Sequence, residues 1–360
     1  MDTGFPVFKD TNLLNIPPKR AGWSDRTALF MAEMSKIAYH QFELNQDGEV
    51  MTQGELDEML GRLLAPLDDT GTATEPDGEE TALVPYIPGD AERLKEDLAR
   101  AGFEIVGLFS DKGTDTQAFL AKSVSDSNSN VRPFGEEEVA ILSFRGTKTI
   151  KDWITNAKGF LKIVDDAQVH AGFQKAFDSV EPSIREKLDP LLKENRTLYL
   201  TGHSLGGALA MFASREIAPE SHGACYTFGS PRVARFGFAR AIKTPIYRVV
   251  NSNDVVSRLP PAYVPTIVIF VLRILNVPAF GILKRFIGKF TKYVHHGDMR
   301  FLRRTKNQNH SDLQVVSNPD VVYRFIWYGR GLWASWRSPI DNHDINVYCE
   351  KLAVYAKSRN

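Results

Sequence analysis

Apolar positions follow two different periods along this chain, and segments of the two kinds alternate. Residues 25–39 carry apolar side chains at three- and four-residue spacing, which predicts an amphipathic helix with Ser24 as its N-terminal cap. Residues 103–109, 116–124 and 138–144 are rich in β-branched and aromatic residues and predict strands. Further helices are predicted at residues 90–100, ending before Gly102, and at residues 172–193.

The same alternation continues through the second half of the chain. Strands are expected at residues 197–200, 224–230 and 245–252, and a helix at residues 207–218. Strands that alternate with helices predict an α/β fold with a mostly parallel central sheet and helices on both faces. Residues 66–90 are rich in Pro, Gly, Thr and acidic residues, and they predict an exposed linker.

Composition excludes some classes of protein. The 360 residues are 43% hydrophobic, which suffices for a large core and excludes a chain that is disordered throughout. The net charge is zero, which gives no reason to expect a nucleic-acid partner. The charge is unevenly distributed, because residues 43–104 contain 17 acidic and 4 basic residues, whereas residues 265–306 contain 9 basic residues and Asp298 as the sole acid. The basic segment predicts contact with an anionic partner or surface.

The N-terminus and the cysteine content bear on location. No basic start followed by an apolar run of signal-peptide length is present, and the two cysteines are expected to be reduced. These features favour a cytoplasmic or peripheral membrane protein, with non-classical export as the alternative. Residues 45–55 briefly resemble a calcium loop, but the twelfth ligand position falls on Gly54, so we expect a turn, no metal and no cofactor.

The segment Gly202-His203-Ser204-Leu205-Gly206 carries the clearest chemical signal. It lies between a predicted strand and a predicted helix, which is the setting in which a Gly-x-Ser-x-Gly turn exposes a nucleophilic serine. The glycines permit a tight backbone turn, and the following helix directs its positive end at developing negative charge. Ser204 is therefore the predicted nucleophile.

A serine nucleophile needs an acid and a base. Asp254 follows the strand at 245–252, at the sheet edge where catalytic groups of open α/β sheets collect, although it could instead only cap the next turn. In the order nucleophile, acid, base, the histidine comes later in the chain. The position just before the last helix favours His343, because loops on a rigid scaffold carry such groups. Four histidines qualify by order: His295, His296, His310 and His343.

Six stretches of the chain together resemble the class 3 lipases, a family that includes fungal triacylglycerol lipases and plant acylhydrolases. They cover residues 139–261 almost continuously and then the C-terminal region. The resemblance implies an α/β-hydrolase fold over residues 1–360 as one domain. The matching stretches are SFRGTKTIKDWI, VHAGFQKAF, LYLTGHSLGGALA, YTFGSPRV, YRVVNSNDVVSRLPP and HDINVY.

This resemblance also implies roles for individual residues. Ser204, Asp254 and His343 correspond to the nucleophile, acid and base of the family, and His343 is followed five residues later by the tyrosine of the family's ending. Thr147 and the backbone N–H of Leu205 correspond to the oxyanion hole. Asn156 stands where the family usually has an acid that steadies the oxyanion residue.

Two segments are candidates for covering the site. Residues 150–161, with Ile150, Trp153 and Ile154 on the apolar face, occupy the place of the family's lid, whereas the pattern alone favours an ordinary half-buried helix. Residues 264–292 form an apolar and basic insertion that is too interrupted to span a membrane. Its pattern is typical of a helix at an anionic membrane surface, with a pocket cap or a dimer contact as alternatives.

The expected function is hydrolysis of an acyl ester of a glycerolipid at a lipid–water interface or membrane surface. The basic insertion favours phospholipid-bearing surfaces slightly, and the choice between neutral glycerides and phospholipids stays open. The alternatives are a soluble esterase for short or aromatic acyl groups, and a non-catalytic lipase-like scaffold that binds signalling partners.

Overall fold

A computed structural model of the chain describes most of the elements predicted above. The described residues are 16, 22–40, 90–124, 132–147, 163–164, 169–217, 223–235, 237–259, 293–303, 305, 307, 309–334 and 341–359. The predicted lid at 150–161, the insertion at 264–292, the calcium-like segment and the linker up to residue 89 lie outside these ranges.

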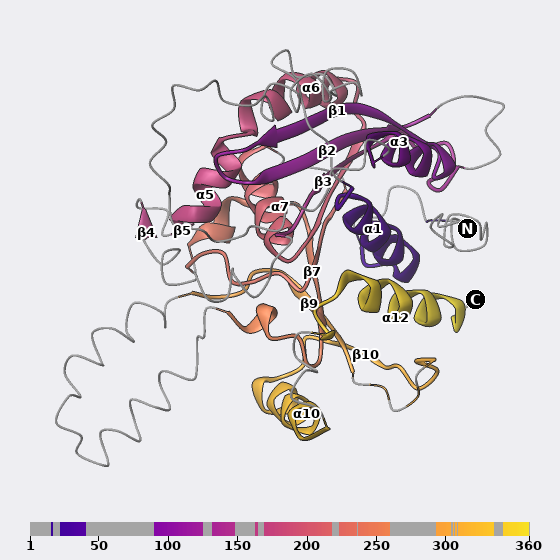
Figure 1. Ribbon diagram of the computed structural model, residues 1–360, viewed down its shortest axis with the longest axis vertical. Helices are drawn as coiled ribbons and strands as arrows, with labels where there is room; N and C mark the ends of the chain where they lie inside the picture. The colour runs from indigo at the N-terminus through magenta and orange to yellow at the C-terminus, as the bar shows by residue number, and fades with distance from the viewer. Residues whose placement is uncertain are drawn as a thin grey trace, which may run out of the picture.

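One eight-stranded sheet organises the described residues, in the order β1-β2-β3-β6-β7-β8-β9-β10 (Figure 1). Strands β3, β6, β7, β8 and β9 are parallel to one another, and the remaining pairings, at the two ends of the sheet, are antiparallel. The prediction of a mostly parallel sheet is confirmed. The strands are β1 (Phe103–Asp111), β2 (Thr116–Ser123), β3 (Val139–Phe144), β6 (Thr197–His203), β7 (Cys225–Phe228), β8 (Ile246–Asn251), β9 (Asp298–Leu302) and β10 (Val315–Ser317), with a separate pair β4 (Ile163–Val164) and β5 (Val169–His170).

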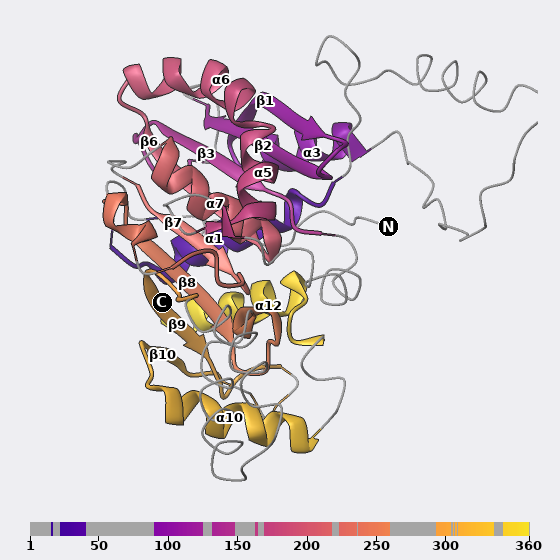
Figure 2. The same ribbon diagram turned by 90° about the vertical axis from the view of Figure 1, so that its left-hand side faces the viewer.

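Helices cover both faces of this sheet (Figures 1 and 2). One face carries α1 (Asp25–Ile37), α3 (Asp90–Arg100) and α12 (Ile345–Lys357), and the other carries α5 (Ala171–Asp178), α6 (Glu181–Lys193) and α7 (Leu205–Glu216). Helix α10 (Val321–Ala334) packs against β8 and β9 through Tyr323 and Trp327. Two 3-10 turns, at Phe238–Ala241 and Val256–Arg258, complete the fold. None of the described helices combines the length and the apolar content needed to cross a membrane.

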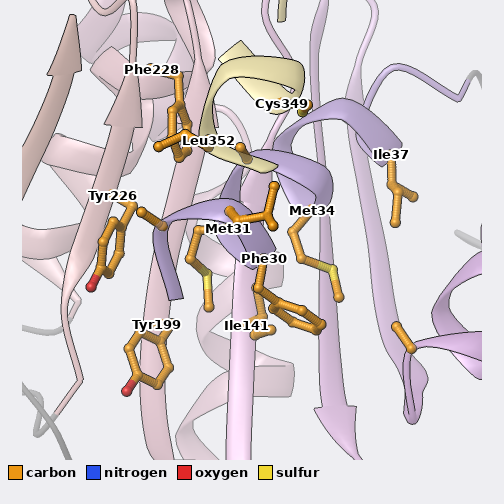
Figure 3. Packing of buried hydrophobic residues seen from close by; sticks show 14 of the residues in the cluster. Phe30, Met31, Met34, Ile37, Ile141, Tyr199, Tyr226, Phe228, Cys349 and Leu352 are labelled. Carbon is orange, nitrogen blue, oxygen red and sulfur yellow. The ribbon is translucent and has the colours of Figure 1, made fainter. Parts of the chain in front are cut away.

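Side-chain alternation along each strand feeds two separate cores. In β3, Val139 and Ile141 belong to the cluster beneath α1 and α12, whereas Ala140 and Leu142 belong to the cluster beneath α5, α6 and α7. Figure 3 shows the first cluster, in which Phe30, Met34 and Leu352 from the helices lie over the sheet. Because successive strand residues point to opposite faces, a strand buried on both sides needs the continuous apolar run seen here.

Local signals explain where the helices begin and end. The Ser24 hydroxyl accepts the N–H of Thr27 at 3.3 Å, as predicted for the cap of α1. Helix α3 ends as predicted, before Gly102 at φ 78°. The prediction of a single helix over 172–193 is wrong, because the chain turns at Ser179 and Val180 and starts α6 with Pro182 in its first turn. A proline fits a helix start because its missing N–H would have no partner there.

Acid is expected to destabilise the protein through His170. This side chain is 2% exposed and stacks on Phe173 with ring centroids 4.2 Å apart. Burial lowers its pKa to about 4, whereas an unfolded histidine has a pKa of about 6.5. Between these values the unfolded chain binds more protons than the folded one. The contribution of His170 to the free energy of unfolding therefore falls as the pH drops below about 6.5, by about 1.4 kcal/mol per pH unit.

Urea unfolding near pH 7 and near pH 5 measures this effect. The difference between the two pH values should be smaller in His170→Gln than in the wild type, because glutamine does not titrate. An unchanged difference would mean that His170 protonates in the folded protein without penalty.

Candidate active site

The predicted nucleophile occupies a sharp turn between β6 and α7. Ser204 has φ 57° and ψ −125°, a backbone conformation that non-glycine residues rarely adopt. A Cβ atom on Gly202 would lie 2.3 Å from the carbonyl carbon of Gly206, and one on Gly206 would lie 2.1 Å from the carbonyl oxygen of Phe144. The glycines on either side of Ser204 are therefore required by the close approach of backbone to backbone, which is why the turn has this spacing.

The predicted acid and base form a buried pair. His343 Nδ1 lies 2.9 Å from Asp254 Oδ2, and both side chains are 0% exposed. A carboxylate can only accept, so Nδ1 carries the proton and Nε2 carries the lone pair. Nε2 is buried and has no hydrogen-bond partner among the residues that the structure describes. A basic ring nitrogen thus remains available to a hydroxyl group.

The Asp254 carboxylate is held by further donors. The Tyr348 hydroxyl donates to Oδ2 at 2.6 Å, and the N–H groups of Val256 and Ser257 donate to Oδ1 at 2.8 and 3.3 Å. Tyr348 in turn accepts the N–H of Asn251, the last residue of β8, at 3.0 Å. These bonds fix the orientation of the carboxylate toward His343.

The turn after β7 brings the acid–base pair to the serine. The Ser204 N–H donates to the carbonyl of Phe228 at 2.9 Å. At the next residue, a Cβ on Gly229 would lie 2.5 Å from Asp254 Oδ2 and 2.9 Å from the His343 ring, at a φ of 59° that favours glycine. Ser204, Asp254 and His343 therefore converge on one backbone turn.

The predicted oxyanion residues Leu205 and Thr147 each adjoin a residue of the nucleophile turn or its close neighbour. Leu205 is the first residue of α7, where backbone N–H groups have no partner within the helix. The chain just after β3 passes close to Ser204, since a Cβ on Gly146 would lie 3.1 Å from the Ser204 Cβ, and Thr147 is the next residue. The lid residues Ile150, Trp153 and Ile154 lie outside the described residues.

A relay that sequence reasoning missed connects the base to the N-terminal helix. His203 Nε2 donates to the carbonyl of His343 at 2.6 Å, and the Tyr39 hydroxyl donates to Nδ1 at 2.7 Å. Burial, followed by the neighbouring His343, holds the pKa of His203 well below its usual range, so the ring is neutral and can accept from Tyr39. The His203 side chain therefore positions the His343 loop. No spacing in the sequence marks Tyr39.

The other three eligible histidines have different partners. His295 Nε2 donates to the carbonyl of Ser257 at 2.7 Å, and His310 Nδ1 lies 2.7 Å from the Thr305 hydroxyl. His296 packs beside the ring of Phe238. All four candidates lie in the described part of the chain, and the structure pairs only His343 with Asp254.

No group of side chains that could hold a metal ion occurs among the described residues.

Comparison with known proteins finds a similarity over the middle of the chain. Residues 141–264 match the family model described as Lipase (class 3), and this range contains Thr147, Ser204 and Asp254. This part of the chain is similar to the class 3 lipases. Among curated members, a secreted mono- and diacylglycerol lipase of Fusarium solani is 35% identical over 130 residues, which cover 34% of this chain and 39% of that protein. A chloroplastic phospholipase A1 of Arabidopsis thaliana is 28% identical over 256 residues, covering 58% and 47%.

The similarity of this chain to curated and solved class 3 lipases is partial. The lipase of Rhizomucor miehei is 30% identical over 154 residues, so the chain spans only 42% of that protein's length. Its propeptide complex matches the present structure with a TM-score of 0.43 at 23% identity, over 61% of each chain. The lipase of Rhizopus microsporus var. chinensis matches with a TM-score of 0.42 at 21% identity, over 63% of this chain and 68% of that one.

Removing the Tyr348 hydroxyl should impair both the stability of the protein and the role of Asp254 in catalysis. Tyr348→Phe loses the bond to Asp254 and leaves the N–H of Asn251 without its acceptor. We expect the free energy of unfolding to fall by about 1–3 kcal/mol, together with a lower kcat and little change in KM. Urea unfolding and steady-state kinetics measure the two effects. Tyr355→Phe, on the same helix α12, is the matched control and should change neither.

Proposed function

We propose that this protein is a serine hydrolase that cleaves carboxylic esters of glycerolipids. The observation that carries the proposal is the buried His343 ring, whose Nδ1 is held by Asp254 while Nε2 has no partner among the described residues. This ring lies against the turn that also holds the strained backbone of Ser204. A hydroxyl, a neutral imidazole and an orienting carboxylate are the components of nucleophilic acyl transfer.

In the proposed mechanism, the Ser204 hydroxyl attacks the ester carbonyl as His343 Nε2 removes its proton. The imidazolium that forms is stabilised by the Asp254 carboxylate, which also holds Nδ1 in the donating tautomer. His343 then returns the proton to the leaving alcohol, and water hydrolyses the acyl-enzyme by the same steps in reverse.

The negative charge of the tetrahedral intermediate falls beside the start of α7. We assign the backbone N–H of Leu205 and Thr147 as its donors, supported by the close approach of Gly146, just after β3, to Ser204. One donor of this kind typically contributes about 3 kcal/mol of transition-state stabilisation. The unpaired N–H groups at the helix N-terminus add a favourable field at the same point.

Glycerolipids are the proposed substrates for two reasons. The relatives are named as lipases of mono- and diacylglycerols and as a phospholipase A1. Helix α10 also supports contact with a lipid surface, because it exposes four large apolar side chains at helical spacing, which place them on one side: Val321, Val322, Phe325 and Ile326, at 42%, 69%, 66% and 49% exposure. Such a face is typical of a helix that lies on a membrane.

The two covering segments remain part of the proposal. Residues 150–161 begin just after Thr147, so a lid there would lie next to the oxyanion donors. The insertion at 264–292 lies in the sequence between Leu259 and Tyr293, the described residues on either side of it. The His295 bond to the Ser257 carbonyl ties the returning chain to the turn that carries Asp254. We propose that both segments belong to the single hydrolase domain and border the substrate.

A panel of acyl-chain lengths and head groups tests the substrate class. Initial rates are measured for triacylglycerol, diacylglycerol, phospholipid and short-chain monomeric esters, with Ser204→Ala as the blank. Long-chain glycerolipids should be preferred, and the rate should rise sharply once the substrate forms micelles. Smooth saturation on monomeric short esters without chain-length preference would instead indicate a soluble esterase.

A fluorophosphonate probe distinguishes an enzyme from a binding scaffold. The probe should label the wild type and not Ser204→Ala. Absence of labelling in correctly folded wild-type protein would favour the non-catalytic alternative.

A further inference from the structure

A pocket lined by three arginines lies outside the proposed active site. Its volume is about 240 Å³, which is room for several water-sized groups. Arg248 comes from the middle of β8, Arg232 from the chain after β7, and Arg324 from α10. No carboxylate contributes to the described lining, whose other members are Tyr293, Val294, His295, Met299, Asn318 and Pro319.

Arg248 is the central group of this pocket. The residue is 5% exposed, and its Nη2 is buried without a hydrogen-bond partner among the described residues. A buried guanidinium without a counter-charge is unfavourable, because desolvation is not offset by pairing. Burial, and then the charges of Arg232 and Arg324, lowers its pKa to about 9, which still leaves it charged at neutral pH.

The neighbouring groups reinforce the positive charge. Arg232 is 7% exposed and is anchored by donation to the carbonyl of Arg258. His295 is neutral, because burial, followed by the charges of Arg248 and Arg232, holds its pKa well below its usual range. The Nε2–H group of His295 donates to the Ser257 carbonyl. Among the described lining residues, the ionised groups are thus the three guanidiniums.

We propose that this pocket binds an oxyanion of the phosphate class. A guanidinium fork matches the paired oxygens of a phosphate and donates two parallel bonds to it. A carboxylate has two oxygens and one charge, which a single arginine satisfies, whereas three converging arginines suit a tetrahedral group with more oxygens and more charge. The phosphate could belong to a phospholipid head group or to a free phosphate compound.

The position of the pocket brings both sources within reach. Arg324 lies on α10, the helix that exposes Val322 and Phe325, so a head group could enter beside a lipid-facing side. The pocket also includes Tyr293 to His295, where the chain returns from the insertion and is tied to the Asp254 turn. The arginine pocket therefore does not include Ser204, and it lies next to the loop that carries Asp254.

Inorganic phosphate is the first probe, with the full chain in phosphate-free buffer at constant ionic strength. The melting temperature of the wild type should rise saturably with phosphate, because a ligand that binds the folded state stabilises it. Arg248→Met should lose this rise, and its melting temperature without phosphate should not fall, since an unpaired buried charge has been removed. Arg324→Gln, at the half-buried rim of the pocket, should weaken phosphate binding by about tenfold. This variant replaces Arg248→Met in the test if Arg248→Met fails to fold.

Arg185→Gln on α6 is the matched control, since it removes an arginine far from the pocket in sequence and on another helix. It should bind phosphate like the wild type. Acetate at the same ionic strength should give no saturable rise. An equal rise with acetate, or an equal rise with phosphate in both pocket variants, would overturn the proposal.

Vesicles distinguish the two sources of phosphate. Ether-linked phosphatidic acid is used because it has no carboxylic ester to hydrolyse, and vesicles with the same negative charge from oleate are the comparison. Preferential binding to phosphatidic acid that disappears in Arg248→Met indicates the head group. Phosphate binding without this preference indicates a free phosphate compound, and the absence of any Arg248-dependent binding in both assays refutes the site. None of these readouts needs ester hydrolysis, so the pocket and the proposed hydrolase can fail independently.

Discussion

Hydrolysis of a long-chain diacylglycerol is expected to fall by about four orders of magnitude or more in kcat when Ser204 is replaced by alanine. The hydroxyl is the only group that the proposed mechanism joins covalently to the acyl chain, and the residual rate would come from the oxyanion donors and substrate binding. Steady-state kinetics on micellar substrate, with active-site titration by a fluorophosphonate, measures the loss.

Ser214→Ala is the matched control for this change. Ser214 is a buried serine near the far end of α7, ten residues after Ser204, and its hydroxyl donates to the carbonyl of Ala210 at 2.9 Å. Its activity should stay close to that of the wild type. The double variant Ser204→Ala with His343→Ala should be no slower than Ser204→Ala alone, because the two groups act as a unit. A substantial further loss would mean that His343 serves another step.

Asp254→Asn is expected to lower kcat by about 10³–10⁴-fold while leaving the fold intact. The reason lies in the donors around the carboxylate. The N–H groups of Val256 and Ser257 can only donate and require an oxygen at the Oδ1 position. The Tyr348 hydroxyl at Oδ2 can rotate and accept instead, so the amide nitrogen takes the Oδ2 position that faces His343. The amide then donates to Nδ1, and the imidazole proton moves to Nε2, where it blocks general-base catalysis.

The kcat on the same substrate, together with the thermal unfolding midpoint, measures this prediction. Asp298→Asn, an exposed residue at the start of β9, is the control and should behave as the wild type. An Asp254→Asn protein that retained most of its activity would show that the tautomer of His343 is set by other contacts. The acid role assigned to Asp254 would then have to be withdrawn.

Periodicity predicted most of the fold. The strand segments from 103 to 252 and the helices beginning at Ser24, Asp90 and Gly207 lie within a few residues of the observed elements. The break near Ser179 was missed because apolar side chains continue at helical spacing through it, as Phe177, Val180 and Ile184 all enter the same core. A pattern of burial cannot distinguish one bent helix path from two short helices that pack on the same face.

The candidate site was predictable where chemistry depends on local sequence. The Gly-x-Ser-x-Gly turn is local, since its glycines are required by close backbone contacts within the turn and with the neighbouring β3. Strand ends in a parallel sheet meet at one edge, so Asp254 could also be inferred from its place after β8. The choice of His343 from four histidines was only favoured by position. The structure pairs its ring with Asp254 through a contact between residues 89 positions apart.

The remaining features depended on tertiary structure alone. The Tyr39–His203 relay joins residues 164 positions apart, and the arginine pocket draws on positions 232, 248 and 324. The sequence by itself determined the strand and helix periods and the nucleophile turn, because these follow from backbone geometry over a few residues. Only the packing of the sheet decided which polar groups meet, because desolvation and hydrogen bonding act between neighbours in space.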